Sequence, residues 1–276
     1  MEECPVRIDT SKPHPARVYD WLLGGKDNYP VDQRVGAALP EQSRRSAARN
    51  REFMHRAAAW LAARGIDQFL DIGTGIPTES NLHQIVQAIR PESRVVYVDN
   101  DPIVLRHAEA LLVSTPQGAN DYIHADVRHP QAILAHARAR LDFDRPVALS
   151  LIALMHFLPD TENPYALTRT LLSALPSGSY LVLSHGTADQ HPDLRQQVED
   201  AYKKGTIPLR MRTRAEVEPF FAGLELVHPG LVFATEWYQE EPAPTQERSG
   251  FYAGVGGCPE PTAGVRLGGS ALGVRR

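Results

Sequence analysis

The stretch that decides the fold reads Gln-Phe-Leu-Asp-Ile-Gly-Thr-Gly-Ile-Pro-Thr and covers residues 68–78. Its first five residues form a short apolar run typical of a buried strand, and Gly73 and Gly75 then interrupt the run, which predicts a tight turn. Glycine has no Cβ, so both residues permit unusual φ values and let a ligand approach the backbone. Taken alone, this pattern fits an ordinary tight turn as well as a nucleotide-type ligand.

Helical and strand-like patterns alternate along the chain on both sides of this turn. Before it, apolar residues recur from Phe53 on one face of a helix that Gly65 ends. Such alternation predicts an α/β fold with a largely parallel sheet and helices on both faces. Strands are expected at 68–72, 94–99, 122–125, 147–154, 179–184 and 251–255, short apolar runs at 224–227 and 231–234, and further helices at 79–89, 102–112, 131–140, 164–175, 193–203 and 215–221.

The composition is that of a globular protein with one substantial core. The chain has 276 residues, 42% of them hydrophobic, and α/β folds of this length commonly form one unit. Its net charge of −4 provides no basic field that would attract nucleic acid. We therefore expect a small-molecule substrate and no nucleic-acid partner.

Neither the cysteines nor the N-terminal residues indicate a metal centre or an export signal. Cys4 and Cys258 lie far apart and form no CxxC pair, so neither a disulfide framework nor a metal site is predicted. Residues 1–20 carry charges and no continuous apolar run, and no segment reaches the roughly 20 apolar residues that span a bilayer. We expect a cytoplasmic protein without a membrane partner, either a monomer or a homodimer.

Three acidic residues follow successive predicted strands. Asp71 lies near the end of the first, Asp99 ends the second 28 positions later, and Asp126 follows the third after a further 27 positions. The carboxyl ends of parallel strands meet at one edge of a sheet, where nucleotide-type ligands bind. Asp99 could accept hydrogen bonds from both hydroxyls of a ribose. Helix capping could explain any one of the three, but a shared polar ligand better explains them together.

These residues resemble, in order and spacing, the cofactor motifs of the Rossmann-fold S-adenosylmethionine-dependent methyltransferases. The resemblance implies a mostly parallel seven-stranded sheet and S-adenosylmethionine as the cofactor. In that family the glycine turn lies along the methionine part of the cofactor, and the second acidic residue holds its ribose. The third acidic residue and its neighbour contact the adenine. A residue beside the second acidic residue could cover the adenine. The cofactor-binding residues that the resemblance implies here are Asp71, Gly73, Thr74, Gly75, Asp99, Asn100, Asp126 and Val127.

One residue departs from the family pattern. A third glycine usually follows Gly75 by two positions, where this chain has Pro77, which has no N–H to donate. A GxGxxG dinucleotide site needs its third glycine to bring a helix against a pyrophosphate, so a nicotinamide-dependent oxidoreductase is disfavoured. The predicted function is methyl transfer to an unidentified small-molecule acceptor. The alternative is a protein that binds the cofactor without turnover.

The segment before the first strand narrows the resemblance. Residues 16–29, together with 71–78, 97–102 and 184–187, are similar to the actinobacterial family once described as a domain of unknown function and now called S-adenosyl methyltransferase. The likeness covers about residues 10–256. The corresponding division is an N-terminal helical lid over 1–52, a methyltransferase domain that binds S-adenosylmethionine over 53–256, and a flexible tail over 257–276 that is rich in Gly and Pro.

The lid is expected to supply side chains to the cofactor. Tyr19 and Tyr29 would provide aromatic walls, and Lys26 or Asn28 would hydrogen-bond to the methionine carboxylate or to the acceptor. The alternative is a helix capped by Gly24 with a turn after it. The arginine-rich run at 44–51 is interpreted as a solvated helix face.

Two histidines follow the strands beside which the acceptor is expected. Methyl transfer from a sulfonium is an in-line displacement, and holding donor and acceptor in near-attack geometry supplies much of its acceleration. A base is needed only when the nucleophile must lose a proton. His156, after the fourth strand, and His185, after the fifth, are the candidate catalytic residues, and each could instead be structural.

Overall fold

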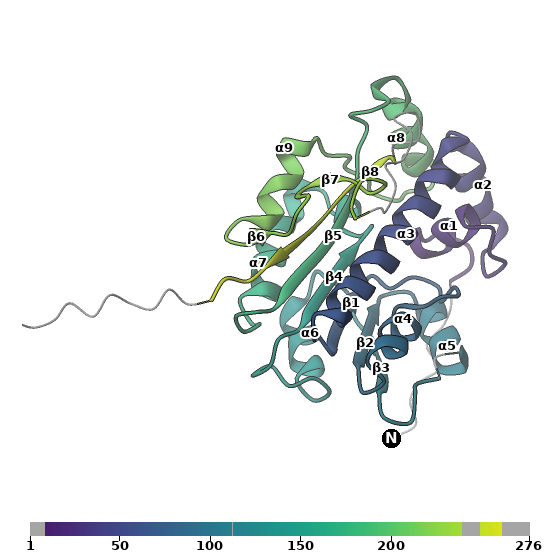
Figure 1. The fold of residues 1–276 in the computed structure, drawn as a ribbon. Helices are drawn as coiled ribbons and strands as arrows, with labels where there is room; N and C mark the ends of the chain where they lie inside the picture. The colour runs from purple at the N-terminus through teal and green to yellow at the C-terminus, as the bar shows by residue number, and fades with distance from the viewer. Residues whose placement is uncertain (1–8, 112, 239–248, 261–276) are drawn as a thin grey trace, which may run out of the picture.

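The structure is a computed structural model that describes residues 9–111, 113–238 and 249–260. One sheet crosses the molecule, and helices cover both of its faces (Figure 1). The described strands are β1 (Gln68–Ile72), β2 (Arg94–Asp99), β3 (Ala119–His124), β4 (Ala148–Ile152), β5 (Tyr180–Gly186), β6 (Glu225–Leu226), β7 (Val232–Phe233) and β8 (Phe251–Gly257).

The order of the strands in the sheet indicates where a ligand would bind. It is β3-β2-β1-β4-β5-β8-β6, and β7 also pairs with β8. Strands β1 to β5 run parallel, whereas β8 is antiparallel to β5. The order therefore reverses between β1 and β4, and α/β sheets bind their ligands at the carboxyl ends of the strands at such a switch point.

The described sheet has eight strands, whereas the sequence analysis predicted seven. Each of the two short apolar runs forms a two-residue strand, and both strands pair with β8. Gly230, with a φ of 92°, lies between them. Both strands run antiparallel to β8, so the segment between them interrupts the pairing, and β6 pairs near Gly256 and β7 near Tyr252. Two-residue strands are too short for alternation to reveal how many form.

The helices follow from the strand pattern. Successive side chains of a strand point to opposite faces, so each buried strand needs a helical layer on both sides. Phe69 of β1 belongs to one core cluster with Phe53 of α3, and Leu70 to another with Ile133 of α6 and Leu171 of α7. The described α-helices are α1 (Pro15–Leu22), α2 (Pro30–Ala38), α3 (Gln42–Ala63), α4 (Leu82–Ile89), α5 (Pro102–Leu111), α6 (Pro130–Ala137), α7 (Pro164–Leu172), α8 (Arg195–Lys204) and α9 (Arg214–Val217), and the 3₁₀ turns are η1 (Met155–Phe157), η2 (Asp160–Glu162), η3 (Pro192–Leu194) and η4 (Glu218–Phe221).

None of the helices within the described ranges is long and apolar enough to cross a membrane.

The N-terminal helices α1 and α2 pack against each other and against α3 and α8 (Figure 1). Buried charge also fixes them to the sheet, because the Arg17 Nε lies 3.0 Å from an Asp101 carboxylate oxygen just past β2. Asp32 of α2, which is fully buried, lies 3.7 Å from the same guanidinium. Helix α3 continues through residue 52, where the sequence analysis ended the lid. At the other end, the predicted tail over 257–276 falls mostly outside the described residues, which stop at 260.

Candidate active site

A cavity of about 300 Å³ lies at the carboxyl ends of β1 to β4, beside the switch point. Its floor is the sheet edge with the glycine turn, and its other walls are the segment around His14, part of α3 and residues 206–208. Ala153 and Thr206 both line it with positive φ values of 53° and 58°. Residues without a glycine's freedom adopt this conformation at a cost, and such strain clusters at binding and catalytic sites.

The glycine turn presents backbone to this cavity. Gly73 and Gly75 have φ values of 77° and 70°, which disfavour a side chain at either position. The Gly73 N–H donates to the Val98 carbonyl at 2.8 Å, which anchors the turn to β2. A Cβ at Gly73 would come within 2.8 Å of the Leu154 side chain, whereas one at Gly75 would meet no atom within 4 Å. The turn is therefore packed on one side and open on the other.

Asp99 holds the turn from the neighbouring strand. One carboxylate oxygen accepts from the Gly75 N–H at 2.8 Å, and the other accepts from the Asp101 N–H at 2.9 Å. The side chain lines the cavity although the residue is only 6% exposed. Burial raises the pKa of Asp99, and nearby His14 opposes this shift. A buried carboxylate with unused lone pairs favours a ligand that brings hydroxyl donors.

Asp126 and its neighbours form the next part of the wall. Asp126 accepts from the Asn100 side chain at 2.9 Å and from the Arg128 N–H at 2.9 Å. Burial alone would raise the pKa of Asp126, but these hydrogen bonds and the Arg128 guanidinium outweigh it and lower the pKa. Val127 is buried and lines the cavity beside Leu158. The arrangement offers apolar surface next to a fixed carboxylate, which suits a planar base with an exocyclic amine.

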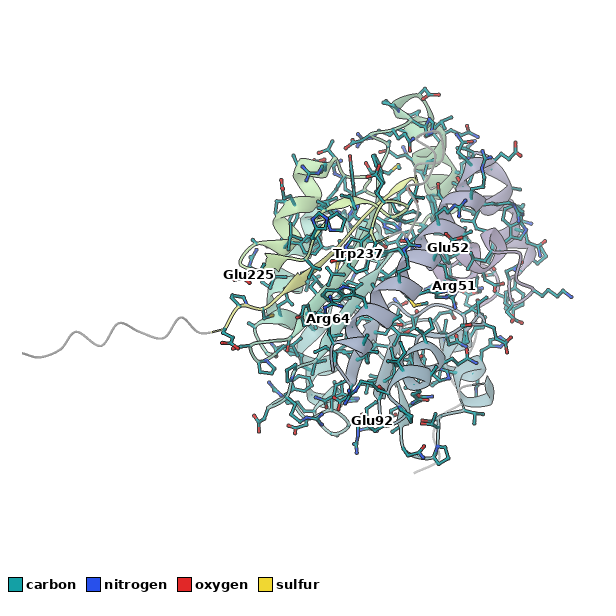
Figure 2. All side chains as sticks on the ribbon, viewed as in Figure 1. Arg51, Glu52, Arg64, Glu92, Glu225 and Trp237 are labelled. Carbon is teal, nitrogen blue, oxygen red and sulfur yellow. The ribbon has the colours of Figure 1, made fainter. Side chains whose placement is uncertain are left out.

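Arg51 is a cavity residue that the sequence analysis missed. It lies on α3 (Figure 2), in the run that was interpreted as a solvated face, yet it lines the cavity and donates to the Thr78 and Ser80 carbonyls. Its Nε is buried without a hydrogen-bond partner in the described part of the chain. Burial lowers the pKa of Arg51, and burial raises the pKa of nearby Asp71 to about 6. No spacing signal distinguished Arg51 from the other arginines of its helix.

The lid residues predicted from the sequence do not all reach the cavity. Tyr19 lines it, and its hydroxyl is fixed by the Ala47 carbonyl and the Asn50 side chain, each at 3.0 Å. Lys26 is exposed and Asn28 donates to Asp20 at 2.8 Å, while Tyr29 packs against Ile76 and Val104. These last three residues are absent from the cavity lining, and their contacts fit the alternative of a capped helix followed by a turn.

A second cavity, of about 110 Å³, adjoins the first. Tyr19 and Phe157 line both cavities and so form a shared wall. The second cavity lies between α1, α8, η1 and the end of β5, and most of its lining is apolar, with contributions from Leu22, Tyr202, Phe251 and their neighbours. His156 is buried and contributes to this lining.

The two candidate histidines have different surroundings. His156 Nδ1 accepts from the Gly186 N–H at 3.2 Å, so a neutral ring carries its proton on Nε2. His185 Nδ1 lies 2.9 Å from the Gly186 carbonyl, to which it must donate, and its Nε2 then accepts from Arg212 at 2.9 Å. His185 lines neither cavity. Burial lowers the pKa of both rings, that of His185 to about 3.

Arg212 links His185 to the turn that carries His156. Its guanidinium is almost fully buried and donates to the Met155 and Leu158 carbonyls and to an Asp160 oxygen. These contacts hold the turn that carries His156 and Phe157. In this geometry, His185 is a hydrogen-bond partner of Arg212. Because both of its ring nitrogens are engaged, neither is free for a proton transfer.

The larger cavity fits S-adenosylmethionine. The buried Asp99 carboxylate matches a ribose, Asp126 and Val127 match an adenine, and the partnerless Arg51 Nε beside Asp71 matches the two charges of an amino acid. The turn at Gly75 leaves open space where ligand and backbone meet. A parallel sheet with its site at the β1/β4 switch point and this lining are those expected of a Rossmann-fold methyltransferase.

Comparison with known proteins identifies the family. Residues 1–259 match the family model described as S-adenosyl methyltransferase, and the chain belongs to that family. It is therefore an S-adenosylmethionine-dependent methyltransferase, which confirms the predicted fold class, cofactor and enzyme class. No curated protein matches the sequence.

Two solved structures are similar over nearly their full lengths. A DUF574 family protein from Streptomyces avermitilis is 47% identical, with a TM-score of 0.88 over 92% of this chain and 100% of that one. A candidate methyltransferase from Thermobifida fusca is 37% identical, with a TM-score of 0.83 over 93% of this chain and 99% of that one.

Proposed function

We propose that this methyltransferase transfers its methyl group to a small molecule bound in the second cavity. The observation that carries the proposal is the wall that Tyr19 and Phe157 share between the two cavities. In-line transfer needs the acceptor next to the reactive carbon, with the reacting atoms about 3–3.5 Å apart. A cavity of about 110 Å³ admits a small molecule but not a folded polypeptide or a duplex.

Each part of the larger cavity has a distinct role in this proposal. Asp99 would accept hydrogen bonds from the ribose hydroxyls, and Asp126 with Val127 would hold the adenine. Arg51 would bind the methionine carboxylate, and ionised Asp71 would attract the ammonium. When bound, the cofactor supplies an electrophilic methyl group on a sulfonium.

The protein's own contribution to the transfer is position and exclusion of water. Tyr19 is fixed by two hydrogen bonds to α3, and Phe157 by the turn that Arg212 clamps. Rigid aromatic walls on either side of the transfer path would restrict the acceptor to a near-attack arrangement. The lid segment around His14, bonded to Asn100 at 3.1 Å, would keep water from the cofactor.

Cofactor binding by the Asp99→Ala variant tests the site assignment. Hydrogen bonds to a charged group contribute roughly 1.5–3 kcal/mol, so titration calorimetry should show the dissociation constant for S-adenosylmethionine rise roughly 10- to 100-fold. Asp144→Ala, which removes an exposed carboxylate before β4 at the opposite edge of the sheet, should bind normally. Unchanged affinity in Asp99→Ala would contradict the site that we propose.

A further inference from the structure

Two polar atoms in the second cavity lack partners. Gln190 lines this cavity, and its Oε1 is buried with no hydrogen bond in the described part of the chain. His156 also lines it, and because Nδ1 accepts from the Gly186 N–H, its Nε2–H is the remaining donor. No described residue bonds to that Nε2 atom. An unpaired buried acceptor is costly, so its presence beside a cavity points to a ligand that donates to it.

The rest of the lining sets the charge of the ligand. The described lining residues include no Asp or Glu, so nothing there would compensate a cationic acceptor. The one guanidinium, that of Arg195, is already paired with Glu199 at 2.9 Å and donates to the Met211 carbonyl. Aromatic and aliphatic side chains form most of the remaining surface. The cavity therefore favours a neutral, mainly apolar molecule.

The size of the cavity limits the ligand to about one ring. An apolar cavity of about 150 Å³ is known to hold benzene. The second cavity, of about 110 Å³, is of the same order. Tyr19, Phe157, Tyr202 and Phe251 contribute rings to it, and flat ligands pack well against such walls.

The absence of a free base among the described residues on the buried side of the second cavity limits which kind of nucleophile can react there. The free nitrogen of His156 already carries a proton, and His185 has both nitrogens engaged. His191 also lines the cavity, but it is exposed and so lies at the rim, away from the buried wall shared with the cofactor. A neutral hydroxyl would have to lose its proton for efficient attack, whereas a neutral nitrogen can attack first and lose a proton afterwards.

Building on the proposed function, we propose that the acceptor is a small, neutral, aromatic nitrogen compound that receives a hydrogen bond from His156 Nε2 and donates one to Gln190 Oε1. The lone pair of the nitrogen that bears the N–H donor forms the new N–C bond as the S–C bond breaks, and the S–C electron pair stays on sulfur. The alkylated nitrogen then releases its extra proton to water. His156 thus acts as an orienting donor and never receives that proton.

The test uses the full-length protein saturated with S-adenosylhomocysteine and 3-aminopyridine as the probe. This one-ring molecule is neutral above pH 7 and has both an acceptor nitrogen and N–H donors. Its dissociation constant, followed by ligand-observed NMR, should be at least about tenfold lower than those of nicotinate, an anion, and benzylamine, a cation. Equal binding of the three probes would overturn the proposal.

Two glutamine variants localise the contact. Gln190→Leu should weaken 3-aminopyridine about tenfold and leave cofactor affinity unchanged. Its stability to urea should be unchanged or higher, since the variant removes a buried acceptor without a partner. Gln196→Leu, on the exposed face of α8, should leave probe binding unchanged. Undiminished probe binding by Gln190→Leu would refute the assignment.

Labelled-methyl transfer separates this inference from the proposed function. With S-adenosylmethionine carrying a labelled methyl group, 3-aminopyridine should become labelled on its amino nitrogen. Its hydroxyl analogue, 3-hydroxypyridine, should not become labelled. Exclusive labelling of the hydroxyl analogue's oxygen would overturn the nitrogen assignment while leaving small-molecule methyl transfer intact. Failure of the wild-type protein to bind S-adenosylmethionine would instead remove the proposed function itself.

Discussion

A matched pair of glycine substitutions isolates the role of the turn after β1. Gly75 and Gly65 have φ values of 70° and 94°, and an added Cβ at either position would meet no atom within 4 Å. The left-handed conformation disfavours a side chain by about 1–2 kcal/mol per residue. Gly75→Ala and Gly65→Ala should therefore lower the free energy of unfolding by similar amounts, about 1–2 kcal/mol each, in urea denaturation.

At Gly75 and at Gly65, the new methyl group would face different surroundings. Gly75 lines the cofactor cavity and donates to Asp99, whereas Gly65 follows α3 before the amino end of β1. A methyl group at Gly75 would displace the cofactor from the backbone and cost at least one hydrogen bond to a charged group, roughly 1.5–3 kcal/mol. Calorimetry should show a roughly 10- to 100-fold weaker S-adenosylmethionine affinity for Gly75→Ala and normal affinity for Gly65→Ala.

A third variant, Gly73→Ala, tests whether a steric clash adds to the loss of stability caused by the positive φ. Gly73→Ala would combine a φ of 77° with an approach of 2.8 Å to Leu154, so its loss of stability should exceed that of the other two. Normal cofactor affinity in Gly75→Ala, or equal weakening in Gly65→Ala, would refute the placement of the cofactor along the turn.

Two further predictions concern charge. Because burial raises the pKa of Asp71 to about 6, the cofactor-free protein should lose stability as pH rises from about 4 to 6, whereas S-adenosylmethionine should bind more tightly over that range. Asp71→Asn should flatten both trends, and calorimetry and urea titrations at several pH values will show whether it does. Arg17→Met would leave the buried Asp101 and Asp32 carboxylates without their cation, so denaturation should show a loss of about 3 kcal/mol, and a loss below about 1 kcal/mol would contradict the ion pair's role.

Features that depend on the pattern of a few neighbouring residues were predicted well from the sequence. The run before Gly73 forms β1 as expected, and the acidic residues at 71, 99 and 126 line one cavity because parallel strands place their carboxyl ends together. The number of strands was wrong by one. Two-residue strands depend on a neighbour that is distant in sequence, here β8, rather than on their own alternation.

Which side chains line the two cavities depended on contacts between distant segments. Nothing in the sequence near Arg51 separates it from its exposed neighbours, because only the packing of α3 over β1 turns it toward the cavity. Lys26 and Asn28 had the right chemistry for a ligand but lie outside both linings. Likewise, the Gly186 backbone assigns the protons of His156 and His185, and neither residue's sequence context could reveal that assignment.

By itself, the sequence determined the glycine turn, the register of the acidic residues and hence the fold and cofactor of this protein. These features follow from strand periodicity and the freedom of glycine, which act over a few residues. Tertiary structure alone decided which lid residues line the cofactor cavity and which histidine lines the second cavity. It also decided that the buried Oε1 atom of Gln190 has no partner there in the described part of the chain. Packing brings together residues that are distant in the chain, such as Tyr19 and Phe157 in the shared wall, and no local pattern predicts such contacts.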